Sequence, residues 1–263
     1  MNFIQFAEMH GLVINSLMLD RWVRVPTVDH PHKKNGSYKY IGTAGWVQNF
    51  ATMETPVMWR DKHAKVDLSV IRKNKEKTEQ DRISRQQKAM SKAGFIMKSA
   101  VKTTHPYLAK KGFAEESGYV WNDLLIIPMR IDGNLVGCQM IDKDGNKKFL
   151  SGQITKGASA IFENKGRDII CEGYATALSV RRALKLARKR YTIHVAFSAG
   201  NIATLSKKLS KHIIIADNDP VGIKTAKSTG RPYWLSDVEG EDANDFEMRA
   251  GTAELSRQLL ALI

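Results

Sequence analysis

Two short apolar segments that end in carboxylates constrain this chain more than any other feature. Residues 167–173 read Arg-Asp-Ile-Ile-Cys-Glu-Gly, and residues 211–219 read Lys-His-Ile-Ile-Ile-Ala-Asp-Asn-Asp. Both are too short for helices and are rich in β-branched residues, which is typical of buried strands. Between them, residues 174–190 have the apolar spacing of a helix, and residues 192–197 indicate a further strand. This alternation predicts a central parallel sheet flanked by helices, an α/β domain in a chain that is α+β overall.

The carboxylates at the ends of these strands are the candidate site. Because the carboxyl ends of parallel strands meet at one edge of a sheet, we expect Glu172, Asp217 and Asp219 to gather there. Three clustered carboxylates repel one another unless a cation is present, and oxygen ligands suit Mg²⁺. Gly173 lets a backbone approach closely and opens the following helix. The sequence therefore predicts a divalent-metal site.

A third acidic element follows at residues 241–245, Glu-Asp-Ala-Asn-Asp. A strand ending in Glu-Gly, a later strand ending in Asp-x-Asp and this element, in that order, resemble the TOPRIM domain of bacterial and phage primases and topoisomerases. The resemblance covers residues 168–251. It implies two-metal nucleotidyl transfer with Mg²⁺ or Mn²⁺. The resemblance also implies that Glu172, Asp217 and Asp219 are the catalytic residues and that the same three residues and Asp242 are the metal ligands. Asp245 is a further candidate ligand. By the same resemblance, Glu172 is either the general base or a metal contact.

The charge balance indicates a polyanionic partner. Lys and Arg number 41 against 27 Asp and Glu, a formal charge of +14, which favours phosphate contacts. No window reaches the roughly 18 apolar residues of a membrane span, and the start lacks the layout of a secretory signal. Cys138 and Cys171 lie in apolar strand candidates, so we expect them to be buried and reduced. A cytoplasmic location is expected, with no membrane partner.

Residues 1–60 predict a small N-terminal module with helices at 4–10 and 14–22, followed by short strands. The resembling primases carry a zinc ribbon here, but this segment has no cysteine, so no zinc is predicted. Aromatic packing is expected to hold the module: Trp22, Tyr38, Tyr40, Trp46 and Trp59. One hypothesis is that these aromatics contact single-stranded DNA together with Lys33, Lys34 and Lys39. The alternative is that the aromatics only form the core.

Residues 61–166 predict a basic subdomain. Ile83, Met90 and Met97 recur every seven residues in a lysine- and arginine-rich stretch, which favours one or two exposed helices with a narrow apolar stripe. Such a stretch is either a solvated face or a DNA-binding surface. The candidate DNA contacts in it are Arg82, Arg85 and Lys88.

Strands at 124–129, 135–141 and 147–150 are separated by turn residues and predict a meander. This meander resembles the subdomain that precedes TOPRIM in primases. By that resemblance Lys148 and Lys156 hold template or nucleotide phosphates; ordinary hairpin-end lysines are the alternative. Lys224 joins them from a helix expected to begin at Pro220. A TOPRIM domain with a C-terminal helix at 245–263 completes the predicted organisation, over residues 167–263.

The function expected from these features is that of a DNA primase of phage, plasmid or mobile-element type. Its partners are a single-stranded DNA template and nucleoside triphosphates. Because no Gly-x-x-x-x-Gly-Lys-Ser/Thr loop is present, a separate replicative helicase is also expected. A TOPRIM metal-dependent nuclease and a non-catalytic DNA-binding replication accessory protein remain alternatives.

Overall fold

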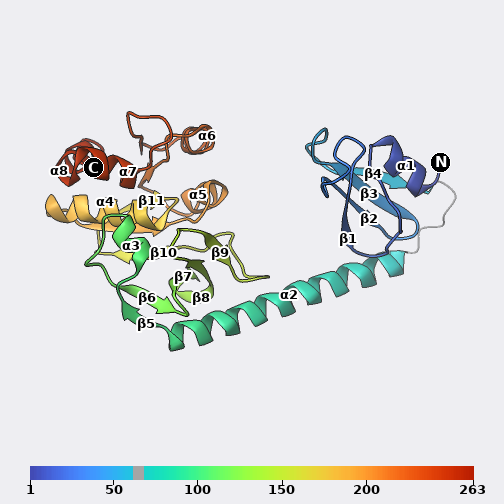
Figure 1. Ribbon diagram of the computed structural model, residues 1–263, viewed down its shortest axis with the longest axis horizontal. Coiled ribbons are helices and arrows are strands. Elements are labelled where there is room, and N and C mark those ends of the chain that lie inside the picture. Colours follow the sequence, from blue (N-terminus) through green and yellow to red (C-terminus); the bar gives the residue numbers. More distant parts are fainter. Residues whose placement is uncertain (62–67) are drawn as a thin grey trace. The chain divides into compact units, whose positions relative to one another are not determined.

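The computed structural model describes residues 1–61 and 68–263, without the side chains of residues 68–74. These residues form two compact units, Met1–Asp81 and Arg82–Ile263, and the division falls within helix α2 (Leu68–Ser99). Figure 1 labels the elements along the chain.

The first unit contains helix α1 (Phe3–Met9) and a four-stranded antiparallel sheet. The strands, in the order β1-β2-β3-β4, are Trp22–Val25, Gly36–Tyr40, Ala44–Asn49 and Val57–Arg60. Asn2 caps α1 in a capping box with Gln5, which satisfies backbone groups at the helix start. Phe3 of α1 packs with Tyr38, Tyr40 and Trp59. The short strands and part of the predicted aromatic core are confirmed.

Two expectations for this unit were wrong. Residues 14–22 form no helix, because non-local contacts hold them to the sheet: Leu19 forms a β-bridge with Tyr40, and the Met18 amide donates to the Tyr38 hydroxyl at 2.9 Å. Trp22 is 51% exposed and therefore takes no part in the core. Trp46 is only partly buried and lies outside the core cluster.

Helix α2 is a single helix, where one or two helices were expected. Of the expected stripe, Met97 is partly buried against the core, but most of the buried face is formed by other residues. Ala89, Ala93 and Ile96 are buried, whereas Ile83 and Met90 are exposed. The buried residues pack with Ile126 and Cys138 of the meander. Small alanines allow the helix to lie close to the sheet, so the contact does not need the larger side chains.

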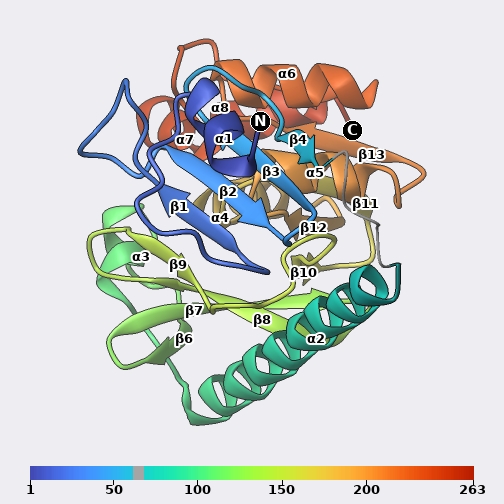
Figure 2. The same cartoon turned by 90° about the vertical axis from the view of Figure 1, so that its right-hand side faces the viewer.

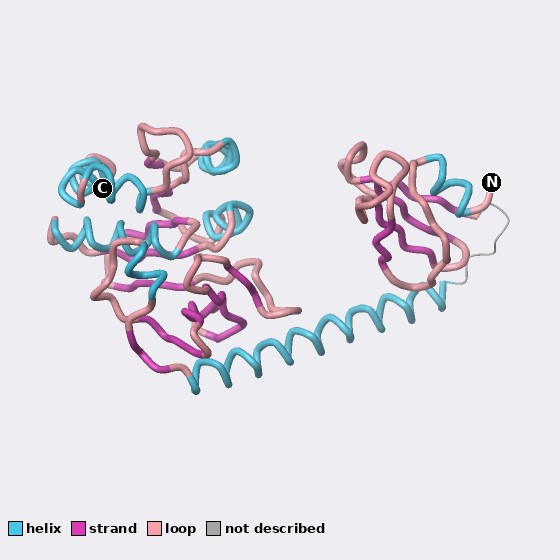
Figure 3. The backbone as a smooth tube through the Cα atoms, in the orientation of Figure 1, coloured by secondary structure: helices cyan, strands magenta, loops and turns pink. Residues whose placement is uncertain are grey.

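The predicted meander is confirmed as a five-stranded antiparallel sheet, in the order β5-β6-β7-β8-β9. Its strands are Val101–Thr103, Gly118–Trp121, Leu124–Ile131, Asn134–Ile141 and Lys147–Phe149, with helix α3 (Pro106–Lys110) between the first two. The turns at Gly133 and Gly145 have positive φ, which glycine adopts without strain. Figure 3 shows the strands of this sheet in magenta.

The second unit contains another sheet besides the meander, called the second sheet below, with the strand order β10-β12-β11-β13-β14. Its strands are β10 (Ala160–Glu163), β11 (Arg167–Cys171), β12 (Tyr191–Val195), β13 (His212–Ile215) and β14 (Tyr233–Trp234). β11 pairs in parallel with β12 and β13, and β13 with β14, while β10 is antiparallel at the edge. The predicted parallel sheet is therefore confirmed, and it includes β10 from before residue 167.

Helices cover both faces of this sheet (Figures 1 and 2). Apolar residues of α4 (Tyr174–Leu186), α7 (Ala243–Ala250) and α8 (Thr252–Leu260) share one core with Ile169, Ile193 and Ile213. The other core joins α5 (Ala199–Ser206) and α6 (Pro220–Thr229) to Ile170 and Ile214. Alternate residues of each strand therefore face opposite helix layers, as the pleat requires.

The C-terminal region differs from the single helix expected over residues 245–263. It forms α7 and α8, which are separated at Gly251, where φ is 88°. A side chain at that φ is strained, so glycine permits the break. Cys138 and Cys171 are both buried and free, as predicted.

Candidate functional site

The parallel strands bring the predicted carboxylates to one edge of the second sheet. Glu172 directly follows β11, and Asp217 follows β13 after Ala216. β11 and β13 are neighbours, with Cys171 opposite Ile215. Asp219 is the N-cap of α6, and Asp242 is the N-cap of α7.

Asp217 is the most perturbed of these acids. Its pKa is raised to about 7, first by burial and then by the Asp242, Glu172 and Asp219 carboxylates, while Lys147 acts in the opposite direction. Its Oδ1 is buried without a hydrogen-bond partner. An unpartnered buried oxygen is uncommon and costly in a folded protein. Asp217 therefore has an oxygen available for a cation.

The pKa of Glu172 is also raised, and again burial is the largest cause. The Asp219 carboxylate is the next cause, and Lys147 opposes both. A carboxylate whose pKa is moved toward neutrality is a better proton acceptor near neutral pH. The environment of Glu172 therefore suits a general base.

Asp219 and Asp242 each commit one oxygen to a helix start. Asp219 Oδ1 accepts from the Gly222 amide at 2.6 Å. Asp242 Oδ1 accepts from the Asn244 amide at 2.6 Å, and its Oδ2 accepts from the Thr176 hydroxyl at 3.2 Å. N-caps of this kind stabilise the first turn and fix the side-chain orientation.

Asn218 lies between the two aspartates, and its side chain serves a different purpose. Its Nδ2 donates to the carbonyl oxygens of Ser236 and Val238, both at 3.0 Å. The amide thus holds the loop that leads to the last acidic element.

Lys147 and Thr176 are two site residues that the sequence reasoning missed. Lys147 begins β9 and acts electrostatically on both Glu172 and Asp217. The available signal was the pleat of β9, since adjacent Lys147 and Lys148 point to opposite faces, but only the tertiary structure selects the face. Thr176 lies in the first turn of α4, four residues after Glu172, and it had no motif of its own.

The phosphate-binding candidates occupy several places. Lys148 is exposed on β9, and Lys224 is exposed on α6. Lys156 lines a small pocket of about 330 Å³ with Ser198, Asn201 and Thr204. Their roles stay predictions.

Asp245 adjoins a second pocket. This pocket has a volume of about 350 Å³, and Lys111 in it forms an ion pair with Asp245 at 3.4 Å. Lys110 and Lys147 also line it. Three lysines beside the carboxylate edge provide positive charge for an anionic substrate.

The proposed DNA contacts are all exposed. Lys33 and Lys34 lie before β2, whereas Arg82, Arg85 and Lys88 lie on α2. Exposure allows phosphate contact, and the DNA-binding role of these five residues stays a prediction.

The residues present fit a divalent cation in chemistry more than in placement. All four acids offer oxygens, which Mg²⁺ and Mn²⁺ prefer. Within residues 1–61 and 68–263, no group of three or more His, Cys, Asp or Glu side chains is arranged to hold a metal ion. Asp217 Oδ1 is buried without a partner, and Asp219 and Asp242 use only Oδ1 for their caps. The oxygen donors are thus of the kind that Mg²⁺ or Mn²⁺ prefers, but the side chains would have to move closer together to hold one ion.

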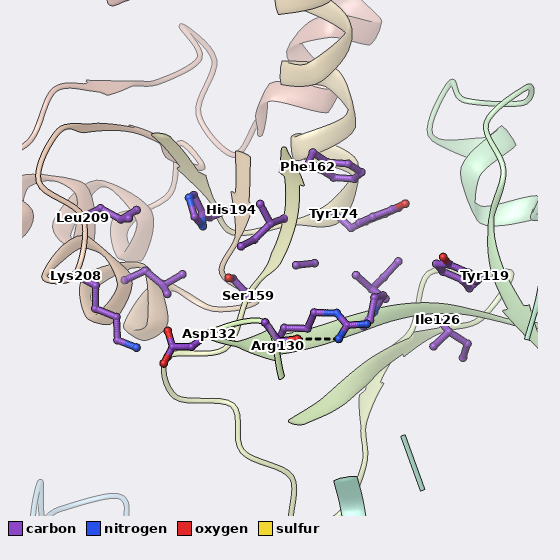
Figure 4. A pocket seen from close by; sticks show the side chains of 17 residues that line it. Tyr119, Ile126, Arg130, Asp132, Ser159, Phe162, Tyr174, His194, Lys208 and Leu209 are labelled. Atoms are coloured by element: carbon purple, nitrogen blue, oxygen red, sulfur yellow. Dashed lines mark hydrogen bonds between the residues drawn. The ribbon is translucent and has the colours of Figure 1, made fainter. Parts of the chain in front are cut away.

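A separate cavity of about 500 Å³ lies between β7 of the meander and the edge of the second sheet (Figure 4). Arg130, His194 and Lys208 contribute polar atoms to it, among apolar residues such as Phe162. His194 Nε2 lies 2.9 Å from Asp168 Oδ1. None of the four clustered carboxylates lines this cavity.

No protein-family model matches the chain. Among solved structures, the chain is similar to one of bacteriophage T7 lagging-strand DNA polymerase interacting with gp4 primase domains bound to an RNA/DNA hybrid and dTTP. The sequence identity is 18%, the match covers 59% of this chain and 85% of that chain, and the TM-score is 0.42. The chain is also similar to the primase fragment of the bacteriophage T7 primase-helicase protein, with 18% identity and a TM-score of 0.41. That match covers 59% of this chain and 69% of that chain. The similarity to the DnaG catalytic core has 14% identity and a TM-score of 0.37, and it covers 59% of each chain. Similarities at this level assign no role to any residue of this chain.

No helix in the described part of the chain combines the length and apolar character that crossing a membrane requires.

Proposed function

We propose that this protein is a DNA primase that synthesises short RNA primers on single-stranded DNA by two-metal nucleotidyl transfer. The observation that carries the proposal is the gathering of Glu172, Asp217, Asp219 and Asp242 around a buried, unpartnered Asp217 oxygen. The order of the acidic elements, which resembles that of TOPRIM primases, supports nucleotidyl transfer over other metal-dependent reactions. On this proposal residues 167–263 are the TOPRIM domain, residues 61–166 a basic subdomain, and residues 1–60 a template-binding module.

The reaction joins the 3′-hydroxyl oxygen of one nucleotide to the α-phosphorus of the next. The bond from that phosphorus to the pyrophosphate oxygen breaks, and pyrophosphate leaves with its electron pair. Glu172 accepts the proton of the attacking hydroxyl, which its raised pKa favours. Mg²⁺ or Mn²⁺, when bound, neutralises and aligns the attacking and leaving oxygens.

The carboxylates of Asp217, Asp219 and Asp242 are the proposed ligands. For Asp219 and Asp242 the ligating atom is Oδ2, because Oδ1 caps a helix. Lys147 contacts the nucleotide phosphates from the pocket that it shares with Lys110 and Lys111. Lys148, Lys156 and Lys224 are proposed contacts for template or nucleotide phosphates.

The test is incubation with single-stranded DNA, Mg²⁺ or Mn²⁺ and labelled nucleoside triphosphates. Short labelled products from the wild type, and none from Glu172→Gln or Asp219→Asn, are expected. Asparagine is the preferred replacement at residue 219 because it also caps helices. Degradation of the DNA without synthesis would move the site to a nuclease. Binding without any reaction would overturn the catalytic proposal in favour of an accessory protein.

A further inference from the structure

The edge of the second sheet is open along strand β10. β10 is the last strand of this sheet and pairs with β12 on one side. Among residues 1–61 and 68–263, the pairing on its other side is a single β-bridge, between Ser159, just before β10, and Arg130 of β7. Each amide of this pair donates to the carbonyl oxygen of the other residue at 2.9 Å. The rest of the edge is free to receive another strand.

A proline explains why the bridge does not extend into a ladder. Continued antiparallel pairing from the bridge would place Ile161 opposite Pro128. Pro128 has no amide proton, so it cannot donate the hydrogen bond that this next pair requires. The meander and β10 therefore separate after the bridge.

The backbone groups of two β10 residues point to the free edge. In an antiparallel ladder, alternate residues direct their amides and carbonyls to opposite sides of the strand. The Asn164 amide donates to the carbonyl oxygen of Tyr191, on the β12 side. Ile161 and Glu163 alternate with Asn164, so their backbone groups point away from β12. Both residues are exposed, Ile161 at 52%. Unpaired groups on an exposed edge are a template for a further strand.

The cavity of about 500 Å³ follows this edge (Figure 4). Ile161 lines it together with Leu205 of α5. Phe162 also lines it, together with Tyr174 of α4, and the ring centroids of these two residues are 5.6 Å apart. Adjacent residues of a strand point to opposite faces of the sheet. A cavity that both Ile161 and Phe162 line therefore reaches around the strand edge, where a further strand would lie.

The two sides of the cavity differ in chemistry. The side of Phe162 and Tyr174 is aromatic. On the other side, His194 lies opposite Ile161, and Lys208 lies just beyond the end of α5. His194 is already paired with a carboxylate of this chain, whereas Lys208 is exposed and forms no ion pair with any residue that the structure describes. Lys208 is thus a cation available to a ligand.

We propose that the β10 edge binds an extended segment of another protein in which acidic and apolar residues alternate. The backbone of this segment pairs with Ile161 and Glu163, as in other cases of strand addition to a sheet edge. Its apolar side chains lie against Phe162 and Tyr174, and its acidic side chains lie on the opposite face, near Lys208. A nucleic acid supplies negative charge but lacks the alternating amides and carbonyls that a strand edge recognises.

The inference goes beyond primer synthesis and does not depend on it. None of the four clustered carboxylates lines this cavity. The edge therefore provides a place to attach a partner protein that leaves the carboxylates accessible.

The experiment titrates a fluorescein-labelled peptide of alternating aspartate and valine with the full chain in EDTA and follows its anisotropy. The comparison peptide has the same composition, with its aspartates grouped at one end. The alternating peptide should bind at least about fivefold more tightly, because only alternation separates acidic from apolar side chains on a strand. Equal affinity for the two peptides overturns the proposal.

Two N-methylated forms of the alternating peptide test the backbone pairing. One form is methylated on the aspartate amides and the other on the valine amides, so each loses the donors of one edge. One form should lose binding and the other should retain it, because a single edge of the peptide faces β10. Equal binding by both forms overturns strand addition.

Lys208→Glu tests the charge, and Lys207→Glu is its matched control. Lys207 is the adjacent exposed lysine, but it lines a different pocket, with Ser228 and Arg231. Lys208→Glu should weaken binding of the alternating peptide about tenfold at low salt, whereas Lys207→Glu should retain the wild-type affinity. Circular dichroism melting checks that both variants fold.

Two results with these variants would overturn the proposal. An equal loss in both variants would mean that the peptide responds only to the overall charge of the protein. If Lys208→Glu weakens binding of a labelled oligothymidylate and leaves peptide binding unchanged, the cavity belongs to a nucleic-acid path.

Discussion

Thr176 in the first turn of α4 donates its hydroxyl to Oδ2 of Asp242, 3.2 Å away. This bond joins the helix that follows Glu172 to the last acidic element and orients the oxygen proposed to bind metal. Thr176→Val keeps the shape but removes the donor, at a cost of about 1 kcal/mol. We expect it to raise the Mg²⁺ concentration needed for half-maximal synthesis about fivefold. Thr176→Ser should restore the wild-type value, and an unchanged Mg²⁺ titration in Thr176→Val would contradict the positioning role.

Asp217→Asn should abolish synthesis and yet stabilise the metal-free protein at alkaline pH. The Asp217 pKa is raised from 3.8 to about 7, so the folded state favours the protonated form. That contribution to stability is fully present below pH about 4 and is lost as the pH rises through about 7. The melting temperature of the variant should therefore exceed that of the wild type more at pH 8 than at pH 5. Equal differences at both pH values would contradict this account.

Lys147 and its neighbour Lys148 offer a matched pair of variants. Lys147 acts on Glu172 and Asp217, so Lys147→Ala should lower primer synthesis about tenfold or more through lost contact with the nucleotide phosphates. Lys148→Ala removes the same charge from the opposite side of β9 and should have a smaller effect. Steady-state kinetics with varied nucleoside triphosphate measure both. A larger loss in Lys148→Ala would restore the assignment made from family resemblance.

His212, at the start of β13, should make stability fall in mild acid. Burial is the main cause that lowers its pKa below 6.5, followed by Arg231, while Asp168 acts in the opposite direction and His194 in the same one. Its Nε2 lies 2.7 Å from the Ser206 hydroxyl. Because the folded state favours neutral imidazole, this contribution is full above pH about 6.5 and is lost as the pH falls through the lowered pKa.

Urea unfolding at pH 7.5 and pH 5.5 tests this. The wild type should lose more stability between the two values than His212→Gln, which cannot titrate. The Gln variant removes only this group, so the other carboxylates and histidines contribute equally to both proteins.

Gly94 and Gly251 should respond to alanine in opposite directions. Gly94 lies inside α2, and a Cβ there meets nothing within 4 Å, so Gly94→Ala should stabilise the protein by about 0.5–1 kcal/mol. Gly251 has a φ of 88° between α7 and α8, so Gly251→Ala should destabilise it by about 1 kcal/mol or more. Denaturant unfolding of the full chain measures both. Destabilisation by Gly94→Ala would mean that the helix contacts a surface there.

The parallel sheet was predictable because its signal is local. Isoleucine-rich runs such as residues 213–215 are too short for helices, and the carboxylates after them mark where the strands end. The same local logic placed the meander turns at Gly133 and Gly145. Each of these features depends on a few adjacent residues.

The errors arose where a distant partner decides the structure. Residues 14–22 have helical spacing, but the Tyr38 hydroxyl and the bridge to Tyr40 hold them in a non-helical conformation. The choice between Lys147 and Lys148 depends on which face of β9 meets the carboxylates, and no local pattern contains that information. Similarly, Ala89 and Ala93 of α2 are buried because a sheet lies against them.

Asp219 and Asp242 each use one carboxylate to start a helix and to supply the proposed metal site. Chemistry and secondary structure thus share the same side chains. An alanine at either position would remove an N-cap and a charge together, so a loss of activity there would not separate failed catalysis from a frayed helix. Two requirements therefore limit which amino acids can replace aspartate at these positions. Asparagine would keep the helix cap but lose the charge, and glutamate would keep the charge but lose the short reach to the backbone.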